Sequence, residues 1–437
     1  MTTTEHRAPS ALSAVDSARV FASVLLPVIA RGAIRRRPRW VALAQRLDTD
    51  RRAVRLLTEL RERYGDRPLR VRVPFRELLI PLDSADANEA LAHTPSPFSP
   101  ATLEKRHALG QFQPHGLLIS PVTDRPERRT FTEHVLDTAN PVHQQGPDFA
   151  TAARSAVGPL LAERELDWEG FSAAWWRLVR QVVLGRGAAE DTLLTNRLFA
   201  LRDAGNWSWL HRKQRRHREV FLRHLGAAID RAEPGSLAAR IVAAEPDGEV
   251  HPADQVAHWL FAFDAAAIAT FRALALLATH PEQELKALAE AEGAPEGSYW
   301  ELPYLRACVL ESLRLWPTTP LLLREATEDT TLAGCRVREG ATVVLFAPYL
   351  HRAPARFDPE IWLNGTADFH GALVPFSGGP AVCPGRNLVL LLTTQVLAAL
   401  RRRHDFGLLS QADLLPDEPP PSVLDHFALR FSVTARR

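Results

Sequence analysis

The sequence predicts a mainly helical fold with a small amount of β structure. Apolar residues recur at helical spacing from about Phe149 to Leu225. A longer pattern runs from about Ala253 to Thr279, is apolar on most faces and stops before His280-Pro281. Such a segment predicts a long helix that crosses the middle of the protein.

Strand patterns are short and few by comparison. Residues 68–82 alternate apolar and polar side chains and then become continuously apolar, which predicts a hairpin. Ala341–Ala347 is rich in β-branched residues, which is typical of a buried strand. Residues 426–435 alternate and predict a closing strand.

The composition is that of an ordinary globular protein, with 437 residues, 46% hydrophobic and 24% charged residues. A net charge of only +2 predicts no general attraction to nucleic acid or anionic lipid. The three cysteines include no Cys-x-x-Cys pair, so we expect neither a disulfide framework nor a zinc site. A reducing cytoplasm fits this cysteine usage best.

An apolar stretch lies between Val20 and Ile34, interrupted by Pro27 and Arg31 and followed by a basic run at 35–39. It falls short of the roughly 20 uninterrupted apolar residues that a membrane span needs. The order is also wrong for a secretory signal, which begins with its positive charges. We expect a buried N-terminal helix and no transmembrane segment, with peripheral membrane contact as the alternative.

Residues 375–388 hold a single cysteine, Cys383, in a loop shaped by glycine and proline just before an apolar helix at about 388–400. Adjacent glycines permit a tight turn, and Gly385 removes a side chain where a flat partner could approach. The helix N-terminus is expected to stabilise an anionic sulfur and lower its pKa. A cysteine placed in this way can be the proximal ligand of a haem.

Phe376, Gly379, Cys383 and Gly385 match the Phe-x-x-Gly-x-x-x-Cys-x-Gly haem loop of the cytochrome P-450 superfamily, which the chain therefore resembles. The resemblance implies haem b (iron protoporphyrin IX) bound through Cys383, with the other three residues shaping the cofactor site. It also implies an α+β fold that is mainly α, as a single large domain over 1–437 with a long helix over the haem. Residues 1–45 are expected to form a loosely attached N-terminal segment.

The upstream sequence Glu311-Ser-Leu-Arg314 is similar to the family's Glu-x-x-Arg helix, whose buried ion pair fixes the structure behind the haem. In the family a further arginine, in a Pro-x-Arg-Phe segment, completes the pair. Here Ile361 stands at the expected position, and Arg356 is the candidate substitute although its register is early.

The two propionates of haem need cationic partners, and arginine suits them through its forked donors. Arg324 matches the family's propionate-binding arginine. Arg125, Arg128 and Arg129 occupy the region of the next basic element, and one of them is expected to contact a propionate. Ala381 replaces the arginine or histidine that the family often has two residues before the cysteine.

Alignment on His280-Pro281 places the segment Phe261–Ala266 over the haem. The family generally has an acid followed by threonine there, and this chain has Asp264 followed by Ala265. Asp264 is expected to be catalytic, in delivering protons. Either a substrate hydroxyl or an ordered water completes the relay, which we favour, or the chemistry depends less on it, as in peroxide-driven oxidation or oxidative coupling.

The resemblance implies a soluble, bacterial-type monooxygenase that oxidises a hydrophobic small molecule, with secondary-metabolite oxidation expected. The pocket wall is assigned to Phe261, Phe263, Ala265, Thr319, Leu321 and Leu322. No nucleotide-binding motif is present, so a ferredoxin and a ferredoxin reductase are the expected electron donors to a monomer. The rival functions are a haem-thiolate peroxygenase and a non-catalytic haem sensor.

Overall fold

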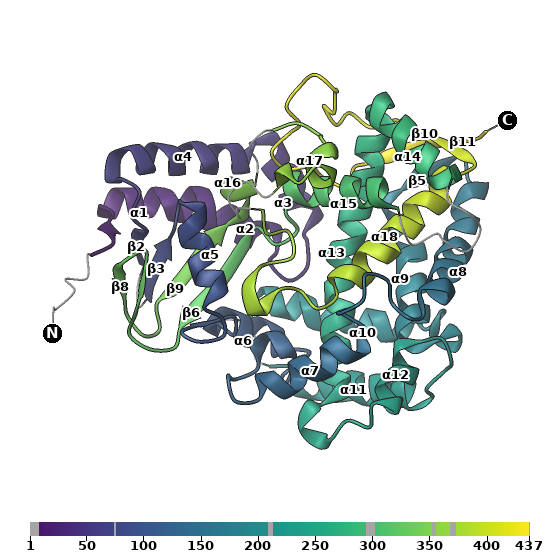
Figure 1. The fold of residues 1–437 in the computed structure, drawn as a ribbon, viewed down its shortest axis with the longest axis horizontal. Helices are drawn as coiled ribbons and strands as arrows, with labels where there is room; N and C mark the ends of the chain where they lie inside the picture. Colours follow the sequence, from purple (N-terminus) through teal and green to yellow (C-terminus); the bar gives the residue numbers. More distant parts are fainter. Residues whose placement is uncertain are drawn as a thin grey trace.

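A computed structural model describes residues 8–73, 76–208, 213–293, 302–351, 355–367 and 373–436. The fold is mainly α with a small β region, as predicted. A sheet and the first helices lie at one end of the molecule, and most of the remaining helices pack at the other (Figure 1). The candidate site lies between these two parts.

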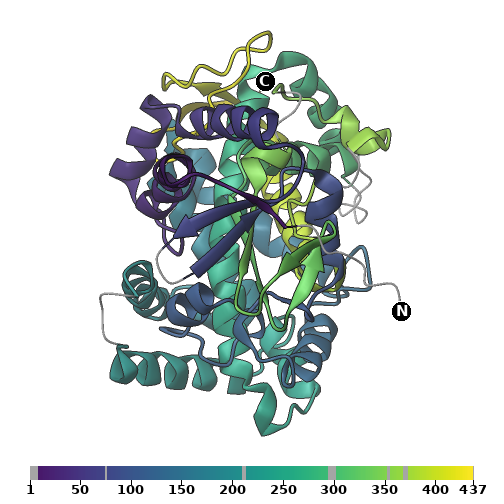
Figure 2. The same cartoon turned by 90° about the vertical axis from the view of Figure 1, so that its left-hand side faces the viewer.

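The largest sheet has the strand order β1-β2-β3-β9-β6-β4 and is seen from its own side in Figure 2. The strands span Ser10–Ala11 (β1), Leu69–Val73 (β2), Arg76–Ile80 (β3), Thr342–Phe346 (β9), Leu321–Ala326 (β6) and Phe98–Ser99 (β4). The antiparallel pair β2–β3 is the predicted hairpin, and β9 is the predicted buried strand. The pairing of β9 with β6 carries the chain segment 321–326 along the wall of the site.

Two smaller sheets complete the β structure of the described residues. One has the order β10 (His404–Leu408), β11 (Arg430–Ala435) and β5 (Glu165–Asp167), and the other pairs β7 (Thr330–Leu332) with β8 (Cys335–Val337). The predicted closing strand therefore begins four positions later than expected, at Arg430. Residues 426–429 precede it as a turn.

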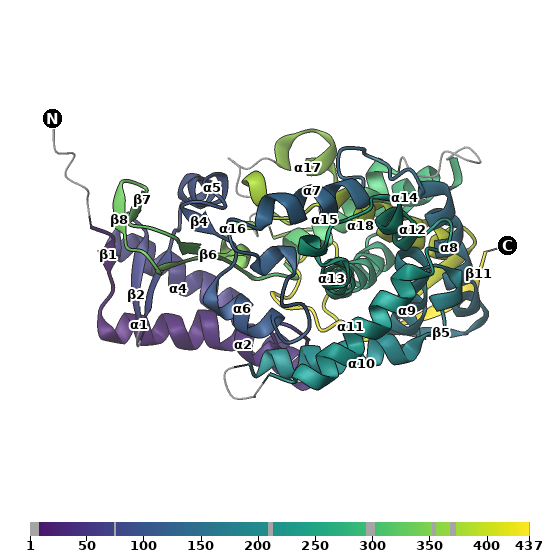
Figure 3. The same ribbon diagram turned by 90° about the horizontal axis from the view of Figure 1, so that it is seen from below.

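Helix α13 (Pro252–Thr279) confirms the predicted long helix and lies at the centre of the helical part, seen end-on in Figure 3. It begins with proline at its first position and ends at Thr279, with His280 as the C-cap immediately before Pro281. Its apolar side chains from Ala266 to Leu277 are almost completely buried in the main core. By length and composition α13 could cross a bilayer, but 78% of its most apolar window is buried inside the protein, as in a core helix.

The other helices surround α13 and the sheet. Their bounds are Pro38–Arg46 (α3), Thr49–Tyr64 (α4), Ser84–Ala92 (α5), Leu103–Leu109 (α6), Arg125–Val135 (α7), Gly146–Val157 (α8), Trp168–Leu184 (α9), Thr192–Asn206 (α10), Arg215–Asp230 (α11), Leu237–Ala243 (α12), Pro281–Gly293 (α14), Pro303–Leu315 (α15), Ala347–His351 (α16), Glu360–Leu363 (α17) and Arg386–Arg401 (α18). The helical pattern predicted from 149 to 225 is thus divided among α8, α9, α10 and α11.

The N-terminal segment contains α1 (Ala14–Val20), a π-helical turn and α2 (Leu26–Arg31). β1 pairs in parallel with β2, and Arg31 makes a buried bidentate ion pair with Asp50 of α4. Although this segment is expected to be loosely attached, its described part is joined to the sheet and to α4. Its apolar face is only partly covered, because Phe21, Leu26 and Ile29 are exposed.

Candidate functional site

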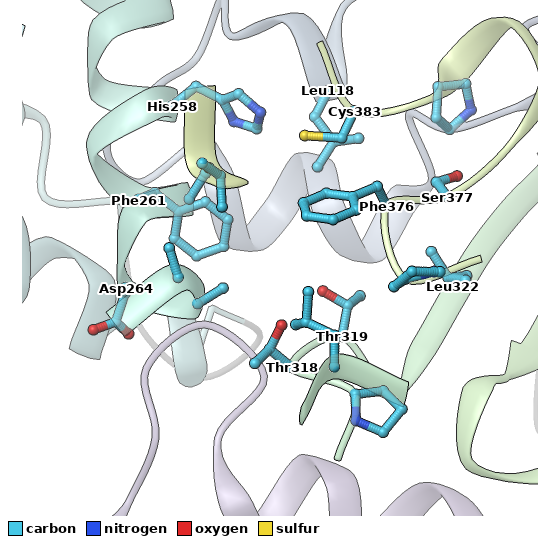
Figure 4. Close-up of a pocket in the computed structure, with 18 of the residues that line it drawn as sticks. Leu118, His258, Phe261, Asp264, Thr318, Thr319, Leu322, Phe376, Ser377 and Cys383 are labelled. Carbon is cyan, nitrogen blue, oxygen red and sulfur yellow. The ribbon is translucent and has the colours of Figure 1, made fainter. Parts of the chain in front are cut away.

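A cavity opens between α13, the loop that carries Cys383 and strand β6. Phe261 and Ala265 of α13, Thr319, Leu321 and Leu322 at the start of β6, and Phe376 and Cys383 of the loop all line it. Figure 4 shows the sulfur of Cys383 directed into the cavity, with Phe261 and Phe376 beside it and Thr318 and Thr319 at the opposite end. The walls are mainly apolar, and the charged side chains that line the cavity lie in separate groups, which are described below.

The cysteine loop is fixed by its own backbone. Gly379 has φ +61°, and a Cβ added there would lie 2.1 Å from the carbonyl oxygen of Leu91, so only glycine fits. The Cys383 amide donates to the Phe376 carbonyl at 2.9 Å. An added Cβ at Gly385 would lie 4.0 Å from the cysteine sulfur, so this glycine keeps the space beside the sulfur free.

Burial raises the pKa of the Cys383 thiol, although the Gly385 amide and the charges of Arg129 and Arg386 act in the opposite direction. The expectation of a lowered pKa is therefore wrong for the free Cys383 thiol. Desolvation outweighs the helix N-terminus, because the sulfur lies among apolar groups. A metal cation at the sulfur would reverse this balance, since a coordinating thiol is deprotonated.

Cations that have no carboxylate partner in the part of the chain that the structure describes line another part of the cavity. Arg324, only 2% exposed, donates to the hydroxyls of Thr94 and Ser377 and to the Leu323 carbonyl. Arg125 donates to the Leu117 carbonyl. Burial lowers the pKa of each arginine to about 10, and a smaller contribution comes from the charge of Arg129 for Arg125 and from the charge of Arg125 for Arg324.

Lys105 belongs to the same group of cations and was not predicted from the sequence. It donates to the carbonyls of Pro100 and Leu323, and burial brings its pKa well below the ordinary value. Within the described residues, no carboxylate forms an ion pair with Lys105, Arg125 or Arg324. Such a cluster fits a ligand with more than one carboxylate, so these residues and Cys383 together fit a haem with its two propionates.

The neighbouring arginines have different surroundings. Arg129 also lines the cavity and donates to the Val382 carbonyl at 2.7 Å, which supports the cysteine loop. The expectation for Arg128 is wrong. Its side chain contacts Ser120, Asp124 and the Glu249 carbonyl and does not line the cavity.

His258 of α13 is a further cavity residue that the sequence analysis did not assign. Burial lowers its pKa to about 4, with smaller contributions from Arg125 and Lys105, and its Nδ1 has no hydrogen-bond partner in the described structure. The sequence alone does not predict that this half-buried imidazole faces the cavity, because the side of the helix that faces the cavity must first be known.

Glu311 and Arg314 form the expected ion pair on α15, with both side chains fully buried. The Arg314 guanidinium donates to both carboxylate oxygens at 2.6 and 2.8 Å. The Trp362 indole and the Asp358 backbone amide also donate hydrogen bonds to the Glu311 carboxylate. No further arginine side chain takes part among the described residues.

Arg356 takes part through its backbone and not through its side chain. Its carbonyl accepts from Arg314 at 2.7 Å, whereas its side chain is 67% exposed and pairs with Asp358. The hypothesis that the Arg356 side chain substitutes for the missing arginine is therefore wrong. The Trp362 indole, next to Ile361, supplies a neutral donor in that region.

The residues of α13 that were predicted to line the pocket do not all lie on the face that points into it. Successive side chains are about 100° apart, so Phe261 and Ala265 share the cavity face. Phe263 does not: it is 3% exposed, packs in the main core, and its carbonyl accepts from the Trp175 indole. The assignment of Phe263 to the pocket is therefore wrong.

Asp264 lies at the edge of the cavity, and its carboxylate forms a 2.6 Å ion pair with Arg202 of α10. Figure 4 shows this carboxylate directed away from Cys383. The Thr270 hydroxyl donates to the Ala266 carbonyl one turn earlier. The catalytic role expected of Asp264 stays a prediction, and the structure adds a second role, as the counter-ion of a buried arginine.

Residues 255–428 match the sequence profile of the cytochrome P-450 family, a range that includes Glu311, Arg314, Arg324 and Cys383. Among curated proteins, the chain is 34% identical over 195 residues to cyclooctat-9-en-7-ol 5-monooxygenase of Streptomyces melanosporofaciens, covering 39% of this chain and 42% of that protein. It is 35% identical over 165 residues to ferruginol synthase of Salvia fruticosa, covering 35% and 32%. The matches thus span less than half the length of these relatives.

The fold is similar over a larger part of the chain. A solved structure described as retinoic acid bound cyanobacterial CYP120A1 has a TM-score of 0.69 at 18% identity, covering 87% of this chain and 94% of that one. The sequence match contains the cysteine loop. Residues 255–428 thus match the cytochrome P-450 family in sequence, and the fold over most of the chain is that of a cytochrome P-450.

Proposed function

We propose that the protein is a haem-thiolate monooxygenase that inserts one oxygen atom from dioxygen into a hydrophobic organic substrate. The observation that carries the proposal is the placement of the Cys383 sulfur in a cavity that Lys105, Arg125 and Arg324 also line, three cations with no carboxylate partner among the described residues. A porphyrin with two propionates joins these features. Haem b is the proposed form.

When bound, an iron porphyrin would supply the redox chemistry that oxidises the substrate with dioxygen and two electrons. Cys383 supplies the thiolate, which donates electron density to the metal. The cations at the cavity edge orient the porphyrin through charge-assisted hydrogen bonds. On α13, the small side chain of Ala265 leaves space for substrate, while Phe261, Leu321 and Leu322 exclude water and bind apolar groups.

The relatives support a substrate of natural-product size. The relatives that share part of the chain's sequence include proteins named cyclooctat-9-en-7-ol 5-monooxygenase and ferruginol synthase. We propose oxidation of a secondary metabolite by a cytoplasmic monomer that receives electrons from a ferredoxin and its reductase. Activity supported by that pair, and by neither component alone, is the expected result in a reconstituted assay.

The decisive experiment is the carbon-monoxide difference spectrum of the reduced protein. Wild type is expected to show the thiolate-specific band, and Cys383→Ser to lose it while keeping the helical signal in circular dichroism. Cys308→Ala is the matched control, because Cys308 is buried outside the cavity. Absence of porphyrin from purified wild type would contradict the proposal, and turnover with hydrogen peroxide alone would favour the peroxygenase.

A further inference from the structure

The end of the cavity opposite Cys383 contains a second positively charged region. It is separate from the group formed by Lys105, Arg125 and Arg324. Arg36, Thr318 and Thr319 line it, together with Ile34 and the ion pair of Arg202 and Asp264. The Arg36 guanidinium donates to the Gly32 carbonyl at 2.7 Å and to the Thr318 carbonyl at 2.6 Å. Both acceptors are neutral, and further N–H groups of the guanidinium remain for a ligand.

The neighbouring carboxylates do not balance the charge of Arg36. The charged groups that act on it are Arg31, Asp50, Arg202 and Asp264. Asp50 is held by Arg31 in a bidentate pair, and Asp264 is held by Arg202.

A fifth group, Arg272, adds positive charge nearby and donates to the carbonyls of Trp316 and Leu424. Burial lowers the pKa of Arg36 to about 10, so the guanidinium is protonated at neutral pH. An uncompensated cation therefore faces this end of the cavity.

The loop that carries Arg36 is held in place from α10. Asn206 accepts from the Ile34 and Arg35 amides and donates to the Arg35 carbonyl. Arg202 donates to the Ile34 carbonyl at 2.8 Å. Because the backbone is fixed on both sides of Ile34, Arg36 enters the cavity from a rigid support and not from a freely moving tail.

We infer that this end binds a carboxylate on the substrate, with Arg36 as the specificity-determining residue. A guanidinium matches a carboxylate in charge and in its planar, forked geometry. The hydroxyls of Thr318 and Thr319 offer additional hydrogen bonds, and Figure 4 shows both side chains at this end. The substrate is then an acid whose apolar body extends past Phe261 and Leu322 toward Cys383.

This inference rests on the proposed haem-thiolate function and refines it. The test uses ferric holoprotein whose thiolate-specific carbonyl band has first been verified. Decanoic, dodecanoic and tetradecanoic acids, with their methyl esters and the corresponding alcohols, are titrated while the substrate-induced spectral shift and the thermal midpoint are followed. At least one acid is expected to bind about 10- to 100-fold more tightly than its ester, the range for a charge-assisted hydrogen bond.

Arg36→Met is expected to remove most of this preference, and Arg36→Lys to retain part of it. Arg39→Met, a change of an exposed arginine outside the cavity, is the matched control and is expected to leave the preference unchanged. If Arg36→Met does not fold, the ratio of acid to ester affinity in wild type decides the question by itself. Acids that bind no better than their esters throughout the series overturn the inference, whereas loss of the carbonyl band overturns the proposed function.

Discussion

The carboxylate of Asp264 lies 2.6 Å from the guanidinium of Arg202, and the same nitrogen of Arg202 donates to the Ile34 carbonyl at 2.8 Å. Asp264 on the central helix is thus connected through α10 to the loop at the far end of the cavity. Arg202 is only 2% exposed, so its charge depends on this one carboxylate for compensation.

Replacing Asp264 by asparagine is expected to destabilise the protein by about 3 kcal/mol, because a buried guanidinium then lacks its counter-ion. The double variant Asp264→Asn/Arg202→Met removes both charges and is expected to recover most of that loss. Denaturant unfolding of wild type, both single variants and the double variant measures the coupling. Equal stability of Asp264→Asn and the double variant would show that the pair has no energetic importance.

The same variants test the relay role predicted for Asp264. Product formed per NAD(P)H consumed is expected to fall in Asp264→Asn and in the double variant, and to persist in Arg202→Met, which keeps the carboxylate. A coupling ratio that follows Arg202 instead of Asp264 would mean that Asp264 only positions its neighbours.

Glu311→Gln is expected to cost about 3–5 kcal/mol of unfolding free energy, because Arg314 would remain as a buried charge without a partner. Trp362→Phe removes one neutral donor to Glu311 and is expected to cost about 1–3 kcal/mol. Arg356→Ala is the control: it keeps the carbonyl that accepts from Arg314, so a change within about 0.5 kcal/mol is expected. A large effect of Arg356→Ala would contradict the structure.

Two adjacent glycines provide a matched pair in the cysteine loop. Gly379→Ala places a Cβ 2.1 Å from the Leu91 carbonyl oxygen at a positive φ, and is expected to lower haem content severely. Gly378→Ala meets nothing closer than 3.4 Å, at an extended φ of −148°, and is expected to keep haem. The ratio of haem to protein in the purified variants distinguishes them, and equal retention would argue against a rigid loop.

Acid is expected to destabilise the fold through His351. Burial, followed by the charge of Arg314, lowers the pKa of His351 to about 3, and its Nε2 accepts from the Val374 amide next to the cysteine loop. An unfolded histidine binds its proton near pH 6.5. The unfolded state therefore binds more protons between these values, and stability is lost as the pH falls from about 6.5 toward 3.

His351→Gln provides an amide oxygen that can accept the same bond without titrating, so its thermal midpoint should vary less between pH 6.5 and 4 than that of wild type. His217→Gln, an exposed change on α11, is the control and should follow wild type. Parallel curves for His351→Gln and wild type would exclude His351 as a source of acid sensitivity.

Local patterns in the sequence were sufficient to predict the central helix, the hairpin, the buried strand and the cysteine loop. Each depends on interactions within a few residues: helical periodicity in α13, alternation in β2–β3, and the conformational limits of Gly379. The pairing of Glu311 with Arg314 is equally local, because residues three apart share one face of a helix. Family resemblance then assigned these segments to a haem site.

Only the tertiary structure decided which neighbouring residues face the cavity. Arg125 and Arg128 differ in sequence by three positions, yet the packing of α7 directs one to the cavity and the other to Ser120. Arg36 and Arg202 have no local feature that marks them, because their roles come from contacts between the N-terminal loop, α10 and α13. Sequence determines local conformation and the chemistry that is available, but the direction of a side chain and the charge that remains unpaired depend on how distant segments pack.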